Sequence, residues 1–301
     1  MVCSMKVGFI GLGSMGYSMA SRLAEKGFTL FVYNRSREKS LKFSREWGAE
    51  VCRSPADAAS LSDVVHIMVS DDEALMDVLL GGKGVLREVR GKVVVQSSTV
   101  TPMASYRAYL LTKESGGRFV EAPVLGSISE AREGRLISFI GGESRDAELM
   151  SVKAYSSKVM YVGPVPQASV IKLAINAMFL TITASLGEAV ALAESWGVEY
   201  GKLFSALKVS WMRGIVERYE NRSLNPQFPT RFKMVLAAKD LSYAFRALRY
   251  RGFTSLIFPA VTNTYLAASA SGMDSRDYSH VVLYLRDLVR GKLIKSLSST
   301  P

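Results

Sequence analysis

A glycine-rich turn between an apolar run and a helical pattern constrains the fold of this chain more than any other feature. The run Val7–Ile10 is followed by Gly11-Leu12-Gly13-Ser14-Met15-Gly16, and a helical pattern extends from Ser14 to Lys26. Gly11 allows a tight turn, Gly13 lets the backbone approach a pyrophosphate, and Gly16 lets helix and strand pack closely. The start of the helix offers unpaired N–H groups to an anion. In this setting the motif predicts a dinucleotide-binding βαβ unit.

Strand-like runs and helical patterns alternate through the rest of the first half. The runs are continuously apolar, which is typical of parallel strands buried on both faces. We expect strands at residues 29–33, 64–69, 92–95, 119–122 and 137–140, with a helix at 37–47.

The pattern changes after Gly163-Pro164-Val165-Pro166, beyond which strand signals are almost absent. We expect a long helix from Gln167 to Ser195, then helices near residues 200–209, 212–220, 232–250, 259–271 and 279–288, and a frayed tail after Lys292. The 301-residue chain is therefore predicted to have two domains, 1–164 and 165–301. The fold class is an α/β Rossmann-type domain with a mostly parallel sheet, followed by an all-α domain entered through a long interdomain helix.

Composition narrows the function classes. Lys and Arg number 38 against 27 Asp and Glu, a net charge of +11, but no long basic run occurs. This favours a basic surface or a site for anionic ligands over nucleic-acid binding. Cys3 and Cys52 cannot form a disulfide framework, and two histidines leave no metal-ligand cluster. Leu173–Ala193 carries Asn176 and Glu188 and is interpreted as a buried helix, not a membrane span. No secretory signal is evident, so we expect a cytoplasmic protein. Since the sequence offers no metal-ligand cluster, we expect no bound metal ion.

The segment after the second strand indicates which cofactor is preferred. An acidic residue that binds the adenosine ribose is expected about 20 residues beyond the glycine turn. The sequence there is Tyr33-Asn34-Arg35-Ser36. Arg35 cannot accept a hydrogen bond from a ribose but can bind a 2′-phosphate, and Arg37 can assist. The sequence predicts NADP, with NAD possible but less favoured.

Motifs along the chain together resemble the β-hydroxyacid dehydrogenases, which include 3-hydroxyisobutyrate dehydrogenase, tartronate semialdehyde reductase and the glyoxylate/succinic semialdehyde reductases. The signature Gly8–Ala20 resembles the family's cofactor motif, and Glu121–Ser127 with Ala131 and Gly134–Leu136 resembles its substrate loop. Lys172–Asn176 resembles the family's catalytic helix. Phe232 and Lys239-Asp240-Leu241 resemble its C-terminal motif. The resemblance covers about residues 5–280 and, in Asn34–Ser36, Met68–Asp71, Glu121 and Ser127, leans toward the glyoxylate/succinic semialdehyde reductases.

The resemblance implies a role for each matching residue. Lys172 would transfer the proton. Substrate would be bound by Gly126, Ser127, Asn176, Phe232 and Asp240. Besides the glycine turn and Asn34–Ser36, cofactor would be bound by Val69, Ser70, Thr99 and Lys239.

Several of these residues also have a plainer structural interpretation. Lys172 and Asn176 are four residues apart and share a helical face, but a lysine there could extend to the surface. Without the resemblance, Lys239 and Asp240 would form a solvated pair, and Phe232 would be core. Thr99 could cap the helix that begins at Pro102. By pattern alone, His66, Trp211 and the methionines are assigned to packing.

The chain departs from the family at a few positions. Leu125 stands where the family has a serine that touches the substrate carboxylate, Pro166 and Ala168 stand where it has glycines, and Ile175 replaces a first Asn. These changes bear on the substrate more than on the chemistry.

The expected function is an NADP-dependent oxidoreductase for a small anionic carboxylic acid, working as a homodimer or homotetramer. Glyoxylate, succinic semialdehyde, 3-hydroxyisobutyrate and L-serine stay open as substrates. The alternatives are a non-catalytic scaffold of the same fold and an imine reductase. Relatives of both kinds replace the lysine, so the presence of Lys172 argues against them.

Overall fold

The computed structural model describes residues 5–291, without the side chains of residues 147 and 148. Cys3 and the tail after Lys292 lie outside the described residues. The chain forms two compact units, of which the first ends at Leu173 and the second begins at Ala174. This division falls inside helix α8 (Gln167–Ser195), just after the predicted domain boundary.

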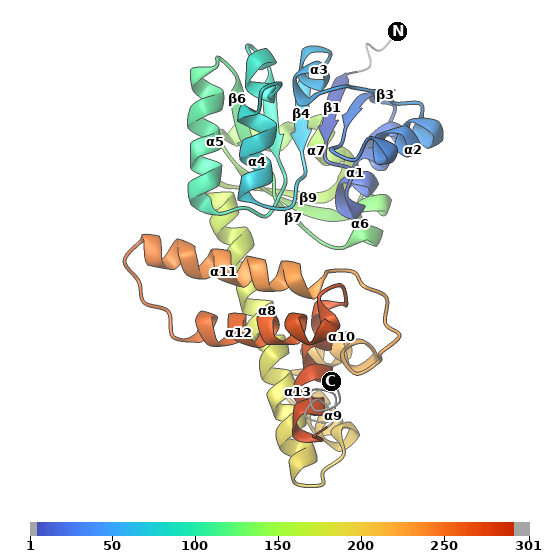
Figure 1. Cartoon of the computed structure of the whole chain (residues 1–301), viewed down its shortest axis with the longest axis vertical. Coiled ribbons are helices and arrows are strands. Elements are labelled where there is room, and N and C mark those ends of the chain that lie inside the picture. Colours follow the sequence, from blue (N-terminus) through green and yellow to red (C-terminus); the bar gives the residue numbers. More distant parts are fainter. Residues whose placement is uncertain (1–4, 292–301) are drawn as a thin grey trace, which may run out of the picture. The chain divides into compact units, whose positions relative to one another are not determined.

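The first unit is built on a nine-stranded sheet in the order β3-β2-β1-β4-β5-β6-β8-β7, with β9 paired to β8 (Figure 1). Strands β1 to β6 are parallel, β8 is antiparallel to β6 and β7, and β9 is parallel to β8. The mostly parallel sheet is thereby confirmed. The strands are β1 Lys6–Ile10, β2 Thr29–Tyr33, β3 Glu50–Val51, β4 Val64–Ile67, β5 Val93–Gln96, β6 Arg118–Glu121, β7 Val124–Leu125, β8 Leu136–Gly141 and β9 Ser156–Gly163.

Helices cover both faces of this sheet. One core cluster contains side chains of α1, α2, α6 and α7, and the other contains side chains of α3, α4 and α5. Neighbouring residues of one strand belong to opposite clusters, as Val64 and Val65 do in β4. This two-sided burial explains why the strands are continuously apolar. The helices are α1 Ser14–Glu25, α2 Arg37–Trp47, α3 Pro55–Ser60, α4 Asp72–Leu80, α5 Pro102–Glu114, α6 Ile128–Glu133 and α7 Met150–Tyr155.

Three strands were not predicted. Strands β3 and β7 have two residues each, too few to show a pattern. Strand β9 begins with Ser156, Ser157 and Lys158, and although residues 159–162 are apolar, it is half-exposed to exposed along its length. It is recruited by pairing with the buried strand β8.

The second unit is helical, as predicted, and its described residues hold only an isolated bridge between Lys233 and Asp277. Predicted and observed helix bounds differ by a few residues at most. Besides α8, the helices are α9 Tyr200–Lys208, α10 Arg213–Ser223, α11 Met234–Tyr250, α12 Ile257–Ala268 and α13 Val281–Val289.

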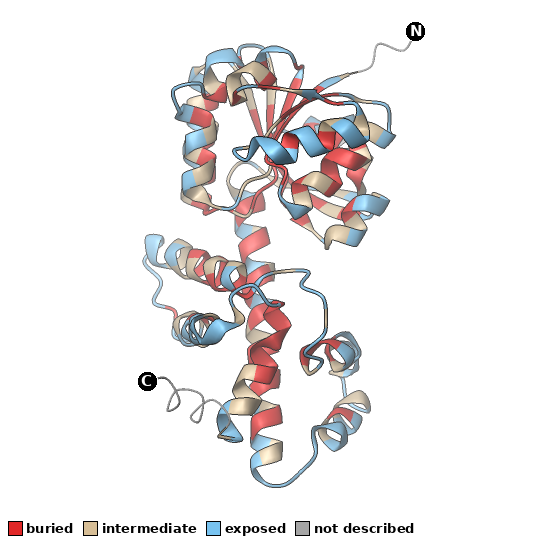
Figure 2. Ribbon diagram, turned by 45° about the vertical axis from the view of Figure 1, so that its right-hand side comes forward, coloured by how far each residue is buried: buried red, intermediate tan, exposed pale blue. Residues whose placement is uncertain are grey.

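Helix α8 is long and apolar, with mean hydropathy 1.6 over its most apolar window, and by these measures alone it could cross a membrane. Half of that window is buried within the structure (Figure 2). Met178 and Leu192 are exposed on it, at 66% and 65% of their surface. The expectation of a buried helix therefore holds for part of its circumference. The assignment of Trp211 to packing was wrong, because its side chain is 84% exposed.

Candidate functional site

The glycine turn has the shape that its sequence predicts. Gly11 has φ +98°, and a Cβ atom there would overlap the main chain of Met68. A Cβ atom at Gly16 would overlap the carbonyl oxygen of Gly11. At Gly13, by contrast, a Cβ atom would meet nothing within 4 Å. The fold itself therefore requires the first and third glycines, whereas the second leaves open space at the turn.

The start of α1 has the features of an anion site. Gly13 is its N-cap and supplies no side-chain cap, and no acidic residue lies in the first turn. Leu12 N–H donates to Asn34 Oδ1 at 2.9 Å, which ties the turn to the end of β2. Exposed N–H groups at a helix start favour a phosphate. The space at Gly13 and the uncapped helix start fit the pyrophosphate of a dinucleotide.

Arg35 lies beside this turn and is exposed. Asn34 Nδ2 donates to Ser36 O at 3.0 Å, so the residues flanking Arg35 are linked across it. Ser36 is the N-cap of α2, again without a side-chain cap. Arg35 and the start of a second helix, α2, therefore follow each other directly in the sequence after the carboxyl end of β2.

Val69 and Ser70 follow the carboxyl end of β4, which pairs with β1, and Thr99 follows that of β5, which pairs with β4. Val69 N–H donates to Ser98 Oγ at 2.8 Å, which links the two segments. The carboxyl ends of parallel strands meet at one edge, where open α/β sheets bind ligands. The sheet order therefore places these predicted cofactor contacts at the same edge as the glycine turn.

The cap of α5 differs from one interpretation of the sequence. Thr101, not Thr99, is the N-cap, and its Oγ1 accepts from Ala104 N–H at 3.1 Å. Thr101 also donates through its N–H and Oγ1 to Asp72, at 2.8 and 2.7 Å. Capping therefore does not account for Thr99.

The predicted substrate loop lies between β6 and α6. Gly126 is exposed with φ +137°, and Leu125 is half-buried in β7. The N–H of Ser127 donates to Glu130 at 2.9 Å, and its hydroxyl donates to the same carboxylate. The Ser127 hydroxyl lowers the pKa of Glu130 to about 2, so this carboxylate is charged at neutral pH. Both donors of Ser127 are thus engaged by a residue of its own helix.

Glu121, the last residue of β6, is fully buried. Its Oε1 accepts from the hydroxyls of Ser105, at 2.5 Å, and Ser169, while its Oε2 accepts from Ala168 N–H at 3.1 Å. Burial raises the pKa of Glu121, whereas these hydrogen bonds act in the opposite direction. The sequence indicated Glu121 only as part of the loop motif. An acidic residue ending an apolar strand was the available signal.

Helix α8 carries Lys172, the predicted catalytic residue, and Asn176, a predicted substrate-binding residue. Lys172 is 9% exposed and lies one turn before Asn176, which is 3% exposed. Asn176 Nδ2 donates to Asp240 Oδ2 at 2.6 Å, while Asn176 Oδ1 is buried without a hydrogen-bond partner among the described residues. Because buried polar atoms are rarely left unpaired, this oxygen is a candidate acceptor for a ligand.

Asp240 also contacts its neighbour. Lys239 Nζ lies 3.1 Å from Asp240 Oδ1 and 4.8 Å from the ring centre of Tyr243. Asp240 is 1% exposed, so the interpretation of these two residues as a solvated pair was wrong. The structure therefore brings together Asn176, Asp240 and Lys239, which lie far apart in the sequence.

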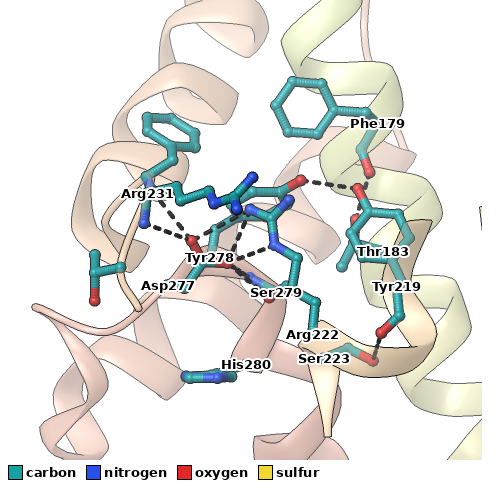
Figure 3. Close-up of polar contacts among 12 residues, drawn as sticks. Phe179, Thr183, Tyr219, Arg222, Ser223, Arg231, Asp277, Tyr278, Ser279 and His280 are labelled. Atoms are coloured by element: carbon teal, nitrogen blue, oxygen red, sulfur yellow. Dashed lines mark hydrogen bonds and ion pairs between the residues drawn. The ribbon is translucent and has the colours of Figure 1, made fainter. Parts of the chain in front are cut away.

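Phe232 is half-buried, and its main chain is bonded to the segment that carries Asp277. Figure 3 shows the buried ion pair that Asp277 forms with Arg222. Asp277 Oδ2 accepts from Phe232 N–H at 3.2 Å, and Tyr278 N–H donates to Phe232 O at 2.8 Å. Arg222 binds Asp277 through Nε and Nη2 at 3.0 and 2.9 Å. Burial opposes the charge of Asp277, but a hydrogen bond from Ser279 and the charge of Arg222 lower its pKa. Sequence reasoning missed this pair.

The ring of Tyr278 lies between two other rings. Its centre is 5.6 Å from that of Phe232 and 5.3 Å from that of Phe179, which lies on α8. Phe179 is three residues beyond Asn176 and continues the same helical face. The Arg222–Asp277 pair thus supports an aromatic group next to Asn176. Residues 5–291, so far as their side chains are described, contain no group of three or more His, Cys, Asp or Glu that could hold a metal ion.

Two family models match the chain. The NAD binding domain of 6-phosphogluconate dehydrogenase matches residues 6–163. The model described as NAD-binding of NADP-dependent 3-hydroxyisobutyrate dehydrogenase matches residues 167–285.

Curated relatives and solved structures extend these matches. Glyoxylate/succinic semialdehyde reductase 1 of Arabidopsis thaliana is 28% identical over 92% of this chain and 97% of its own. The cytokine-like nuclear factor N-PAC of Anopheles gambiae is 30% identical over 94% of this chain. The chain spans only 50% of that relative's length. A structure of Mycobacterium tuberculosis 3-hydroxyisobutyrate dehydrogenase with L-serine has a TM-score of 0.81 at 22% identity, covering 94% of this chain and 99% of its own, which shows a shared fold.

Proposed function

The chain belongs to the β-hydroxyacid dehydrogenase family, and from this we propose that it is an NADP-dependent oxidoreductase that transfers a hydride between nicotinamide and a short hydroxyacid or semialdehyde. One observation carries the proposal: a buried lysine, Lys172, lies one turn before an asparagine whose amide is held by Asp240. Burying a lysine is costly, so a packed helix rarely places one there without a use.

Each of these side chains has a task in the proposed reaction. Bound nicotinamide supplies or accepts the hydride. In reduction, negative charge grows on the substrate oxygen, where the Lys172 ammonium stabilises it and donates a proton. In oxidation, a neutral Lys172 removes that proton. Asn176, one turn further along α8, holds the substrate beside the amine, and Asp240 fixes the orientation of the Asn176 amide.

The preference for NADP rests on Arg35. An arginine at the end of β2 replaces the acid that would bind a ribose hydroxyl, and it can bind a 2′-phosphate in a bidentate manner. The first N–H groups of α2, next to Arg35, add to the favourable potential for that phosphate. The second matching family model is described as NADP-dependent, which agrees with this proposal.

A small carboxylate is the proposed substrate class, as the names of the relatives suggest. Glyoxylate and succinic semialdehyde are favoured by the Arabidopsis relative, and 3-hydroxyisobutyrate and L-serine by the Mycobacterium structure. Leu125 offers no hydroxyl, and Ser127 is engaged by Glu130, so this loop holds a carboxylate less well than a loop with free hydroxyls. The main-chain N–H groups around Gly126 can still bind the substrate carboxylate. The net positive charge of the chain also favours an anionic substrate.

We also propose a homodimer or homotetramer, supported by the exposed apolar residues Met178 and Leu192 of α8. The low cysteine content supports a reducing compartment such as the cytoplasm.

An initial-rate panel tests the function. Glyoxylate, succinic semialdehyde and methylmalonate semialdehyde are assayed with NADPH and NADH, and 3-hydroxyisobutyrate and L-serine with NADP and NAD. A cyclic imine is included because imine reduction is an alternative. Turnover of at least one acid, with NADP(H) preferred, is the expected result. Turnover of the imine alone would replace the proposal with imine reduction.

The second candidate function is a non-catalytic scaffold, favoured by the 30% identity to N-PAC. It predicts NADPH binding in a calorimeter without turnover of any compound in the panel. Lys172 argues against it, since a scaffold has no use for a buried amine at this position.

A further inference from the structure

We infer that Glu121 is the positioning residue of the site: its buried carboxylate holds the start of α8 against β6 and α5 and thereby sets the place of the Lys172 amine. This inference rests on the proposed role of Lys172. Glu121 is not itself catalytic, because its side chain is fully buried and its described hydrogen bonds are to other protein groups.

The carboxylate joins the segments that carry three predicted parts of the site. It ends β6, directly before the loop with Gly126 and Ser127. Ser105 lies in α5, the helix that follows Thr99. Ala168 and Ser169 form the first turn of α8, which leads to Lys172. A change at this one carboxylate would therefore loosen the loop, the Thr99 segment and the lysine helix together.

The bonds supply what the start of α8 lacks. The first turn of α8 contains no acidic residue. The first N–H groups of a helix have no partner within the helix, and a negative charge near them is stabilising. Glu121 provides the acceptor from another element of the first unit.

The packing around Glu121 leaves room for its carboxylate. Gly141 of β8 pairs with Glu121, and a Cβ atom at Gly141 would overlap the carboxylate and press on Ala168. A glycine opposite the carboxylate keeps this space free. The junction between β6, α5 and α8 is therefore formed by Glu121, its hydrogen-bond donors and Gly141.

The connection to Lys172 is short and stiff. Ser169 is three residues before Lys172, so both lie on one side of α8 in successive turns. A displacement of about 1 Å in a reacting group can cost about 100-fold in rate. Loss of the bonds to Glu121 should therefore appear in kcat, because the amine acts in the chemical step.

The test uses Ser169→Ala and Glu121→Gln, with Ser151→Ala as the matched control. Ser151 is a fully buried serine of the same unit, and its hydroxyl bonds to His66 Nε2 at 2.9 Å, away from α8. We expect kcat to fall about 10- to 100-fold in both test variants and to stay unchanged in the control. KM for NADPH should stay unchanged in Ser169→Ala, which removes only the bond from the α8 hydroxyl. The double variant should lose no more than the worse single variant, because both changes break one junction.

Hydrogen exchange provides a readout that needs no activity. The amides of residues 168–172 should exchange faster in Ser169→Ala and Glu121→Gln than in the unmodified protein or in Ser151→Ala. If Glu121→Gln fails to fold, Ser169→Ala alone decides the matter, since it removes one donor and leaves Glu121 in place.

Failure of the inference and failure of the function look different. If Lys172→Ala abolishes turnover but both test variants keep kcat and normal exchange, Glu121 does not position the lysine and the function stands. If Ser151→Ala loses as much kcat as they do, the effect is a general weakening of the core, which also overturns the inference. If Lys172→Ala keeps its turnover, the proposed function is wrong, and with it the inferred role of Glu121 in catalysis.

Discussion

At the scale of single residues, Lys172 has the strongest predicted effect. Replacing it with Ala should lower kcat about 10²- to 10⁴-fold while NADPH binding stays nearly intact, because the amine handles the proton and does not hold the cofactor. Lys172→Arg should restore little, because a guanidinium stays protonated and cannot act as a base. Steady-state kinetics with NADPH titration measures both effects.

Lys202→Ala, at an exposed lysine of α9, is the control and should leave kcat unchanged. A Lys172→Ala variant that loses only NADPH affinity would reassign the lysine to cofactor binding.

Arg35 sets the expected cofactor preference. Its bidentate contact with a 2′-phosphate is worth ~1.5 to 3 kcal/mol, roughly a tenfold to hundredfold preference for NADPH. Arg35→Asp should reverse the preference, since it removes the phosphate contact and adds an acceptor for the ribose hydroxyl. The ratio of kcat/KM for NADPH to that for NADH measures this, and Arg45→Asp, at an exposed arginine within α2, should leave it unchanged. Equal kcat/KM values for NADPH and NADH in the unmodified protein would contradict the assignment of Arg35 to the 2′-phosphate.

Leu125 and Glu130 together limit what the substrate loop can bind. Both donors of Ser127 go to Glu130, so a hydroxyl at position 125 would be a new donor for a carboxylate. Leu125→Ser should lower KM for glyoxylate by up to about tenfold with little change in kcat, because the bond forms equally in ground and transition states. Leu110→Ser, at an exposed leucine of α5, is the control. An unchanged KM for every acid tested would mean that Leu125 does not face the substrate.

At the scale of elements, strand β4 contains a group that makes stability depend on pH. His66 is fully buried, its Nε2 contacts Ser151 Oγ at 2.9 Å, and burial lowers its pKa to about 3. Below pH ~6.5 the histidine binds a proton in the unfolded chain but stays neutral in the folded one. The stability that this neutral group contributes is therefore present above pH ~6.5 and lost progressively as pH falls toward 3.

Urea unfolding between pH 7 and 4 measures this loss, which should reach a few kcal/mol for this residue, at about 1.4 kcal/mol for each pH unit. His66→Leu should be less stable at neutral pH, because Ser151 loses its partner, but its stability should fall less steeply with acid. Parallel pH profiles for the two proteins would show that other groups cause the acid sensitivity.

At the scale of the whole molecule, NADPH binding should stabilise the folded chain. A ligand at 100 times its dissociation constant adds about 2.7 kcal/mol to the free energy of unfolding, which for a chain of this size raises Tm by about 5 °C. The same concentration of NADH should raise Tm less, and Arg35→Asp should reverse this difference. Thermal unfolding with each cofactor provides the measurement. A larger shift with NADH would contradict the proposed cofactor.

Local signals in the sequence determined most of the elements. Strand β2 and helices α2 and α8 have the predicted bounds, because apolar periodicity and flanking glycines act over a few neighbouring residues. The glycine turn was equally local, since the requirement for Gly11 and Gly16 arises within the βαβ unit that they connect. The resemblance then indicated Lys172, Asn176 and Asp240, whose burial no local pattern would have shown.

Tertiary structure decided which side chains meet. Strand β9 pairs with the buried strand β8, although its first three residues are polar and none of its residues is buried. The bonds of Glu121 to Ser105 and Ser169 span 16 and 48 residues, and that of Arg222 to Asp277 spans 55. A bond of this kind depends on how whole elements pack, because burial selects the partner that satisfies each polar group. The sequence by itself therefore specified the elements and the chemistry available to them, whereas packing determined which acids support the site.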